Sequence, residues 1–305
     1  MKKTPLIHRR GLWLGLSLIL TTLSIVAMAV WGLRVGIDFK GGQLIEASFR
    51  KPTTIDDIRN TLGENHDLPS TTAVESGSNT FLIRTTTENT DQLTALKDQL
   101  TKIGEWDQIR FESVGPTVGK DLTKKAIIAV VLASLAIILY IAFAFRQVPA
   151  PTNSWQFGIT AVIALLHDLL ITIGAFSLFG HLYGFEVDSL FITALLTVMG
   201  FSVHDTIVTY DRIRENLLGH AKDMKFSDIV VSSINQTLVR SLNTSLTLVL
   251  VLLSLVVLGG SSIRPFIAAL LVGVVAGAYS SIFLASQLLV IWQAWSQKRR
   301  ERVSA

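Results

Sequence analysis

The chain has 305 residues, of which 50% are hydrophobic and only 16% are charged, and its mean hydropathy is +0.49. This composition excludes an ordinary soluble protein and indicates a membrane protein. The absence of cysteine excludes a disulfide framework and Cys-ligated zinc or iron–sulfur sites. The net charge of +4 is carried by basic clusters beside apolar segments, which favours a membrane-topology signal over a nucleic-acid partner.

Six apolar segments are long enough to cross a bilayer as helices. A hydrocarbon core of about 30 Å requires about 20 helical residues. We therefore predict a polytopic α-helical membrane protein with six transmembrane helices. The segments are residues 11–33, 126–145, 156–180, 187–210, 241–263 and 265–297.

The first apolar segment also resembles a cleavable signal peptide, because Lys2 and Lys3 precede it and residues 27–29 are Ala-Met-Ala. A signal peptide has an apolar core of only about 7–15 residues, whereas residues 11–33 are all uncharged. We therefore expect a retained first helix.

The only large polar region, residues 34–122, lies between the first two spans and predicts one α+β domain. Its patterns give a strand, a helix, two strands joined by a turn, a helix and a strand. This β-α-β-β-α-β order is that of a ferredoxin-like unit. The predicted elements are residues 43–49, 54–64, 72–75, 80–86, 91–103 and 106–114.

Glycine-rich segments bracket this domain at residues 36–42 and 114–119. Glycine permits positive φ and proline fixes its own φ, so these segments are either hinges to the membrane spans or tight turns. Neither segment carries a dinucleotide or Walker motif, so we expect no nucleotide cofactor and no ATP-driven enzyme. The candidate hinge residues are Gly36, Asp38, Gly41, Gly42, Gly115 and Pro116.

Basic residues precede the first span and follow the second, fourth and last spans, whereas the short loops on the opposite side hold only Arg264. By the positive-inside rule, both termini are predicted to be cytoplasmic and the α+β domain extracytoplasmic. Residues 216–239 are predicted to form an interfacial amphipathic helix. The predicted division is residues 1–33, with the first span; 34–122, the α+β domain; 123–297, the other spans with a cytoplasmic loop at 211–239; and 298–305, a basic tail.

Two aspartates lie inside apolar spans and are candidates for ion or proton coupling. A charged side chain at the bilayer centre costs about 2.5–3.5 kcal/mol on insertion scales, so it is usually retained for function. Asp168 is expected near the bilayer midplane, and Asp205 nearer the cytoplasmic end of its helix. Arg240 opens the fifth span from the same side and is expected at a similar depth to Asp205. This pair would be either part of a relay or a structural ion pair.

Polar residues near Asp205 and after Arg240 are expected to hold water beside the carboxylate. Ser202 and Thr206 accompany Asp205 on its helix. His167 and His204 each precede an aspartate. Successive residues project about 100° apart on a helix, so we expect neither histidine to bond to its neighbour.

Other patterns concern metal binding and helix packing. No His-x-x-x-His or Glu-rich spacing is present, so we expect no metal site. Gly273 and Gly277 form a Gly-x-x-x-Gly pattern, which is typical of close helix packing.

Residues 200–216 closely resemble the signature of the SecD/SecF family, which belongs to the bacterial Sec protein-export machinery and is related to the RND transporters. Residues 36–42, 114–119, 240–245 and 279–285 resemble further motifs of this family in the same order. The resemblance covers nearly the whole chain.

The resemblance implies a subunit of the bacterial inner membrane that couples ion flow to preprotein export. Proton or Na⁺ flow through the spans would drive motion of the periplasmic domains, with Asp205 and Arg240 as the transmembrane acid and base. The implied partners are SecD, the SecYEG translocon, YajC, the preprotein substrate and membrane lipid. The resemblance implies no cofactor.

Two alternatives come from other functional classes. Half of an RND-like small-molecule exporter would use the same acid but would require a ligand cleft in a larger domain. A passive scaffold for translocon assembly would not depend on Asp205. Six spans with one extruded domain make half of a two-half transporter, so the second half is expected from another chain.

Overall fold

The computed structural model describes residues 10–63, 71–86, 90–146, 148–149, 152–220 and 224–304. Within these residues, six helical segments are long and apolar enough to span a membrane, as predicted. They are α1 (Arg10–Trp31), α5 (Pro116–Ala144), α6 (Ser154–Tyr183), α7 (Ser189–His220), α8 (Phe226–Leu258), and α9 (Arg264–Ser280), which continues through the π-helical turn η2 (Ser281–Ala285) into α10 (Ser286–Ser304).

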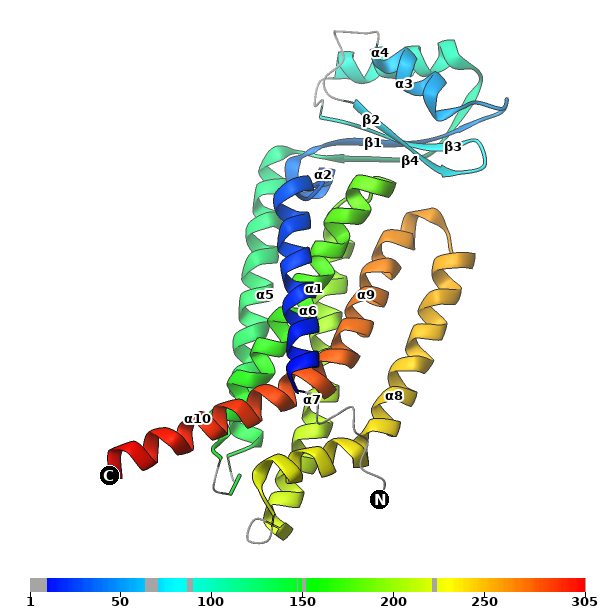
Figure 1. Cartoon of the computed structure of the whole chain (residues 1–305). Coiled ribbons are helices and arrows are strands. Elements are labelled where there is room, and N and C mark those ends of the chain that lie inside the picture. The colour runs from blue at the N-terminus through cyan, green and yellow to red at the C-terminus, as the bar shows by residue number, and fades with distance from the viewer. Residues whose placement is uncertain are drawn as a thin grey trace.

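These helices, which we call the membrane part, pack side by side below the α+β domain (Figure 1). Helices α6 and α7 carry many buried side chains and lie within the bundle. Helices α1, α5 and α8 instead expose rows of leucine, isoleucine and valine. Exposed apolar faces of this kind suit lipid or the apolar face of another membrane helix.

The α+β domain consists of a four-stranded antiparallel sheet with two helices on one face. Its strand order, β2-β3-β1-β4, is that of the predicted ferredoxin-like unit. The predicted strand at residues 106–114 agrees with the observed one. The elements are β1 (Gly42–Phe49), α3 (Ile55–Gly63), β2 (Thr71–Gly77), β3 (Thr80–Thr85), α4 (Thr90–Ile103) and β4 (Trp106–Val114).

Successive side chains along each strand point to opposite faces of the sheet. On one face, Ile45 and Ile83 pack against Leu96 and Leu100 of α4 in a closed hydrophobic core. On the other face, Leu44, Leu82 and Arg84 line a cavity towards the membrane part. Figure 1 shows the sheet across one end of the bundle, with α3 and α4 on its far side. One face of the domain is therefore available to contact the helices.

The predicted cytoplasmic loop at residues 211–239 is mainly helical. Helix α7 continues to His220 and α8 begins at Phe226, so only a short connection separates them. The prediction that the apolar face of residues 216–239 lies on the bilayer surface is wrong, because Ile229 and Ile234 are buried in the same core cluster as Ile213 of α7. The apolar face of this segment therefore packs against α7.

Candidate functional site

Asp168 is a completely buried carboxylate that joins three helices. Its Oδ2 accepts hydrogen bonds of 2.6 Å from the hydroxyls of Ser202 on α7 and Ser280 on α9. Its Oδ1 lies 3.0 Å from Nδ1 of His167. Three polar partners therefore replace the water that this carboxylate would have outside the protein.

The contact between His167 and Asp168 contradicts our expectation that neighbouring residues would not bond. An imidazole is long enough to turn along the helix surface towards the carboxylate of the next residue. The other ring nitrogen of His167, Nε2, is buried and has no hydrogen-bond partner within the described residues. His204 differs, since its side chain is exposed.

Small residues allow α7 and α9 to approach closely enough to form this site. A Cβ added at Gly277 would lie 3.2 Å from Cβ of Ser202 and 3.7 Å from Oδ2 of Asp168. A Cβ added at Gly273 would overlap the side chain of Val198 on α7. Both glycines of the Gly-x-x-x-Gly pattern therefore lie at a helix–helix contact, and Gly277 borders the carboxylate itself.

Sequence reasoning missed two serines of this cluster. Ser280 bonds to Asp168, and Ser281 accepts a 2.9 Å hydrogen bond from Thr206 while donating to the carbonyl of Ser202. The available signal was a pair of adjacent serines inside an otherwise apolar span. The π-helical turn that begins at Ser281 carried no such signal, and turns of this kind are frequent at functional sites.

Asp205 lies on a neighbouring face of α7, towards α8. Its side chain is half-buried, and its Oδ2 accepts a 3.1 Å hydrogen bond from Ser245. Arg240 is exposed, and no ion pair joins it to Asp205 among the described residues. The structure therefore places Ser245, rather than Arg240, against this carboxylate.

The residues predicted to surround Asp205 are divided between two sites. Ser202 and Thr206 turn towards Asp168 and Ser281. Only Ser245, from the polar run after Arg240, bonds to Asp205. The two intramembrane carboxylates thus have separate sets of hydroxyl partners. Within the described residues, no group of three His, Asp or Glu side chains is arranged to hold a metal ion.

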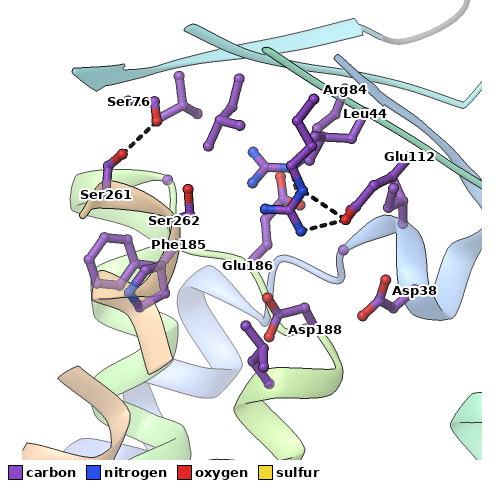
Figure 2. A pocket seen from close by; sticks show the side chains of 18 of the residues that line it. Asp38, Leu44, Ser76, Arg84, Glu112, Phe185, Glu186, Asp188, Ser261 and Ser262 are labelled. Carbon is purple, nitrogen blue, oxygen red and sulfur yellow. Dashed lines mark hydrogen bonds and ion pairs between the residues drawn. The ribbon is translucent and has the colours of Figure 1, made fainter. Parts of the chain in front are cut away.

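The α+β domain is attached to the membrane part by several contacts, which we call the docking contacts (Figure 2). Arg84 of β3 forms a 2.9 Å ion pair with Glu186, in the loop between α6 and α7. Ser76 of β2 shares a 2.7 Å hydrogen bond with Ser261, before α9. Asp38 accepts a 2.8 Å hydrogen bond from the backbone N–H of Ser189, at the start of α7. These contacts surround a cavity of about 500 Å³.

The acidic groups in this region are partly removed from water. Burial raises the pKa of Glu186, and the positive charge of Arg84 opposes this shift. Burial also raises the pKa of Asp188, against the hydrogen bond from the N–H of Phe191. The docked arrangement therefore makes both carboxyl groups easier to protonate than they would be in water.

The two glycine-rich segments pack against each other. Gly41 and Gly42 have φ of 80° and 130°, in the region that favours glycine. A Cβ at Gly41 would lie 3.0 Å from Pro116, and one at Gly119 would lie 2.8 Å from the carbonyl oxygen of Phe39. The short helix α2 (Ile37–Lys40) is thereby held against the start of α5. In this state the segments form tight turns.

Comparisons with known proteins find similarity over nearly the whole chain. Residues 94–295 match the family model described as protein export membrane protein SecD/SecF, C-terminal. The chain is 44% identical to the protein translocase subunit SecF of Thermobaculum terrenum, over 91% of this chain and 90% of that protein. It is 40% identical to the SecF subunit of Anaerolinea thermophila, over 95% and 94% of the two chains.

A solved structure has the same arrangement. The crystal structure of SecDF from Thermus thermophilus, described as a translocon-associated membrane protein, matches with a TM-score of 0.83 and 31% identity. The match covers 96% of this chain but only 39% of the SecDF chain. Most of that longer chain therefore has no counterpart here.

Proposed function

The chain belongs to the SecD/SecF family of protein-export membrane proteins, and we propose that it acts as the SecF-type subunit of the Sec export machinery. The similarity to SecF subunits along almost their whole length supports this role. So does the pairing of six spans with a single ferredoxin-like domain, which is half of a two-half transporter. We place the protein in the bacterial cytoplasmic membrane.

The proposed partner for the second half is SecD. The matched SecDF chain is much longer than this one, so its remaining portion would come from a separate chain here. The exposed apolar faces of α1, α5 and α8 are surfaces that a second set of membrane helices would cover. Further proposed partners are the SecYEG translocon, YajC, membrane lipid and the preprotein substrate.

Within this function, we propose that Asp205 carries the coupling ion, H⁺ or Na⁺. The observation that carries this proposal is a half-buried carboxylate inside a membrane helix that bonds to one hydroxyl and forms no ion pair among the described residues. A carboxylate is energetically costly to place in a membrane, so a protein usually retains one there for a function such as ion transfer. Asp168 would act as a second, deeper carboxylate, and Arg240 would change the charge state of Asp205 when the helices move.

The test is Asp205→Asn, measured as preprotein export and ion flux in the same membrane vesicles. The amide keeps the size of the side chain but cannot take up and release a proton, so gradient-driven export and flux should both be lost. Asp205→Glu should retain part of each activity. Normal gradient-dependent export by Asp205→Asn would instead support the passive scaffold. Export of small molecules by the wild-type protein would support the RND-like exporter.

We propose that the α+β domain is extracytoplasmic and that both termini are cytoplasmic. The basic residues at the opposite end of the bundle support this orientation. A cysteine at Ser78, in the hairpin between β2 and β3, should react with a membrane-impermeant thiol reagent outside intact spheroplasts. A cysteine at Lys225, between α7 and α8, should be protected. The native sequence has no cysteine to interfere, and the reverse labelling pattern would invert the topology.

A further inference from the structure

Two buried hydroxyls between α7 and α8 have no hydrogen-bond partner within the described residues. They belong to Thr209 on α7, which is 0% exposed, and Ser241 on α8, which is 2% exposed. A helical serine or threonine usually satisfies its hydroxyl on a carbonyl one turn earlier, as Thr237 does at 3.1 Å. Because an unsatisfied buried hydroxyl is unfavourable, such groups are usually bonded to water or serve a function.

The register of α7 and α8 places these two hydroxyls opposite each other. The helices are antiparallel, with Asp205 bonded to Ser245 at one point and Asn216 bonded to Ser233 at another, at 2.8 Å. Thr209 follows Asp205 by one turn on α7, and Ser241 precedes Ser245 by one turn on α8. The two hydroxyls are therefore the next polar groups along the interface after the Asp205 carboxylate.

Polar contacts continue from this point to the end of the helix pair. Arg212 of α7 bonds to Gln236 of α8, and the amide of Asn216 donates to both Gln236 and Ser233. These contacts reach the exposed end of the bundle that is opposite the α+β domain (Figure 1).

Towards the α+β domain the character of α8 changes. There, Leu252 is buried in an apolar cluster with Ile267 and Val274 of α9. The polar groups therefore connect Asp205 with one end of the membrane part only.

We propose that Thr209 and Ser241 form a water-binding relay between Asp205 and the end of the membrane part opposite the α+β domain. The inference rests on the proposed role of Asp205, with H⁺ as the coupling ion. In each transfer, the donor oxygen loses its O–H bond to the moving proton, and the next oxygen along the relay forms a new O–H bond with that proton. The last transfer protonates the Asp205 carboxylate. A hydroxyl suits this position because it both donates and accepts. The relay needs no oxidant or cofactor.

Removing the two hydroxyls should lower ion flux without lowering stability. In the double variant Thr209→Val with Ser241→Ala, ion flux and gradient-driven export should fall at least about tenfold, since positioned proton-transfer groups typically contribute more than that. The melting temperature should stay the same or rise, because each change removes a buried hydroxyl with no protein partner. Thr209→Ser keeps the hydroxyl and should retain the flux.

Matched controls are Thr197→Val on α7 and Thr247→Val on α8. Both hydroxyls are exposed and already bond to a carbonyl of their own helix. These variants should keep wild-type flux. Normal flux in the double variant, beside an Asp205→Asn variant without flux, would overturn the relay while leaving the proposed function in place. A large fall in melting temperature would also overturn it, by assigning the hydroxyls a structural role. If the wild type has no Asp205-dependent flux, both proposals fail.

Discussion

Replacing Asp168 with alanine is expected to destabilise the membrane part by roughly 3 kcal/mol or more. Each buried donor that loses its acceptor costs about 1–3 kcal/mol. The change would remove the acceptor of Ser202, Ser280 and His167 together. Ser280 can turn to the carbonyl of Gly277, 3.3 Å away, so the main loss falls on the other two. The measurement is thermal unfolding of the purified protein in detergent.

The matched controls are Asp168→Asn and Asp205→Ala. The amide oxygen of Asn still accepts a hydrogen bond, so Asp168→Asn should recover part of the stability. Asp205 is half-buried and has one hydroxyl partner, so its removal to alanine should cost less than the same change at Asp168. Equal melting temperatures for Asp168→Ala and the wild type would show that the cluster does not stabilise the bundle.

Locking the α+β domain onto the membrane part is expected to abolish export. The proposed hinge at Gly41, Gly42, Gly115 and Pro116 would let the domain rotate once the docking contacts break. Ser76 and Ser261 suit a disulfide lock because their hydroxyl oxygens are 2.7 Å apart. A disulfide needs its Cβ atoms about 3.8 Å apart. The double variant Ser76→Cys with Ser261→Cys should export preprotein when reduced and stop when oxidised. The measurement is preprotein export before and after reduction.

Each single cysteine variant controls for the substitutions themselves and should export under both conditions. Full export by the oxidised double variant, with the disulfide verified by gel mobility, would reject the requirement for undocking.

The same cysteine pair also reports how docking depends on pH. Burial raises the pKa of Glu186, so the docked state binds a proton that the undocked state releases. Docking should therefore strengthen as pH falls from the raised pKa towards the ordinary value, although protonation weakens the ion pair with Arg84. The charged groups acting on Glu186 are Arg34, Lys40, Arg84 and Asp188. At each pH, the rate of disulfide formation is compared with the rate in a Glu186→Gln background. This comparison cancels the pH dependence of the thiols themselves. Docking that weakens with falling pH would mean that the ion pair outweighs burial.

Local sequence patterns predicted most of the architecture. Each span is long and apolar by itself, and each strand of the α+β domain has its own alternation or turn signal, as in the hairpin at residues 77–80. These patterns depend only on neighbouring residues, so they can be recognised without knowledge of the fold. The error about the interfacial helix at residues 216–239 has the same origin. A polar stretch with regularly spaced apolar residues is typical both of a helix on the membrane surface and of the ends of two helices that pack together.

The sequence alone determined that two carboxylates lie inside membrane helices and that a polar run follows Arg240. Only the tertiary structure decided which hydroxyl serves which carboxylate. Ser202 and Thr206 are neighbours of Asp205 in sequence, yet they face Asp168 and Ser281. Ser280, which bonds to Asp168, lies 112 positions further along the chain. The physical reason is that helix rotation and register are set by close contacts between distant segments, such as Gly277 against Ser202, and no local pattern encodes them.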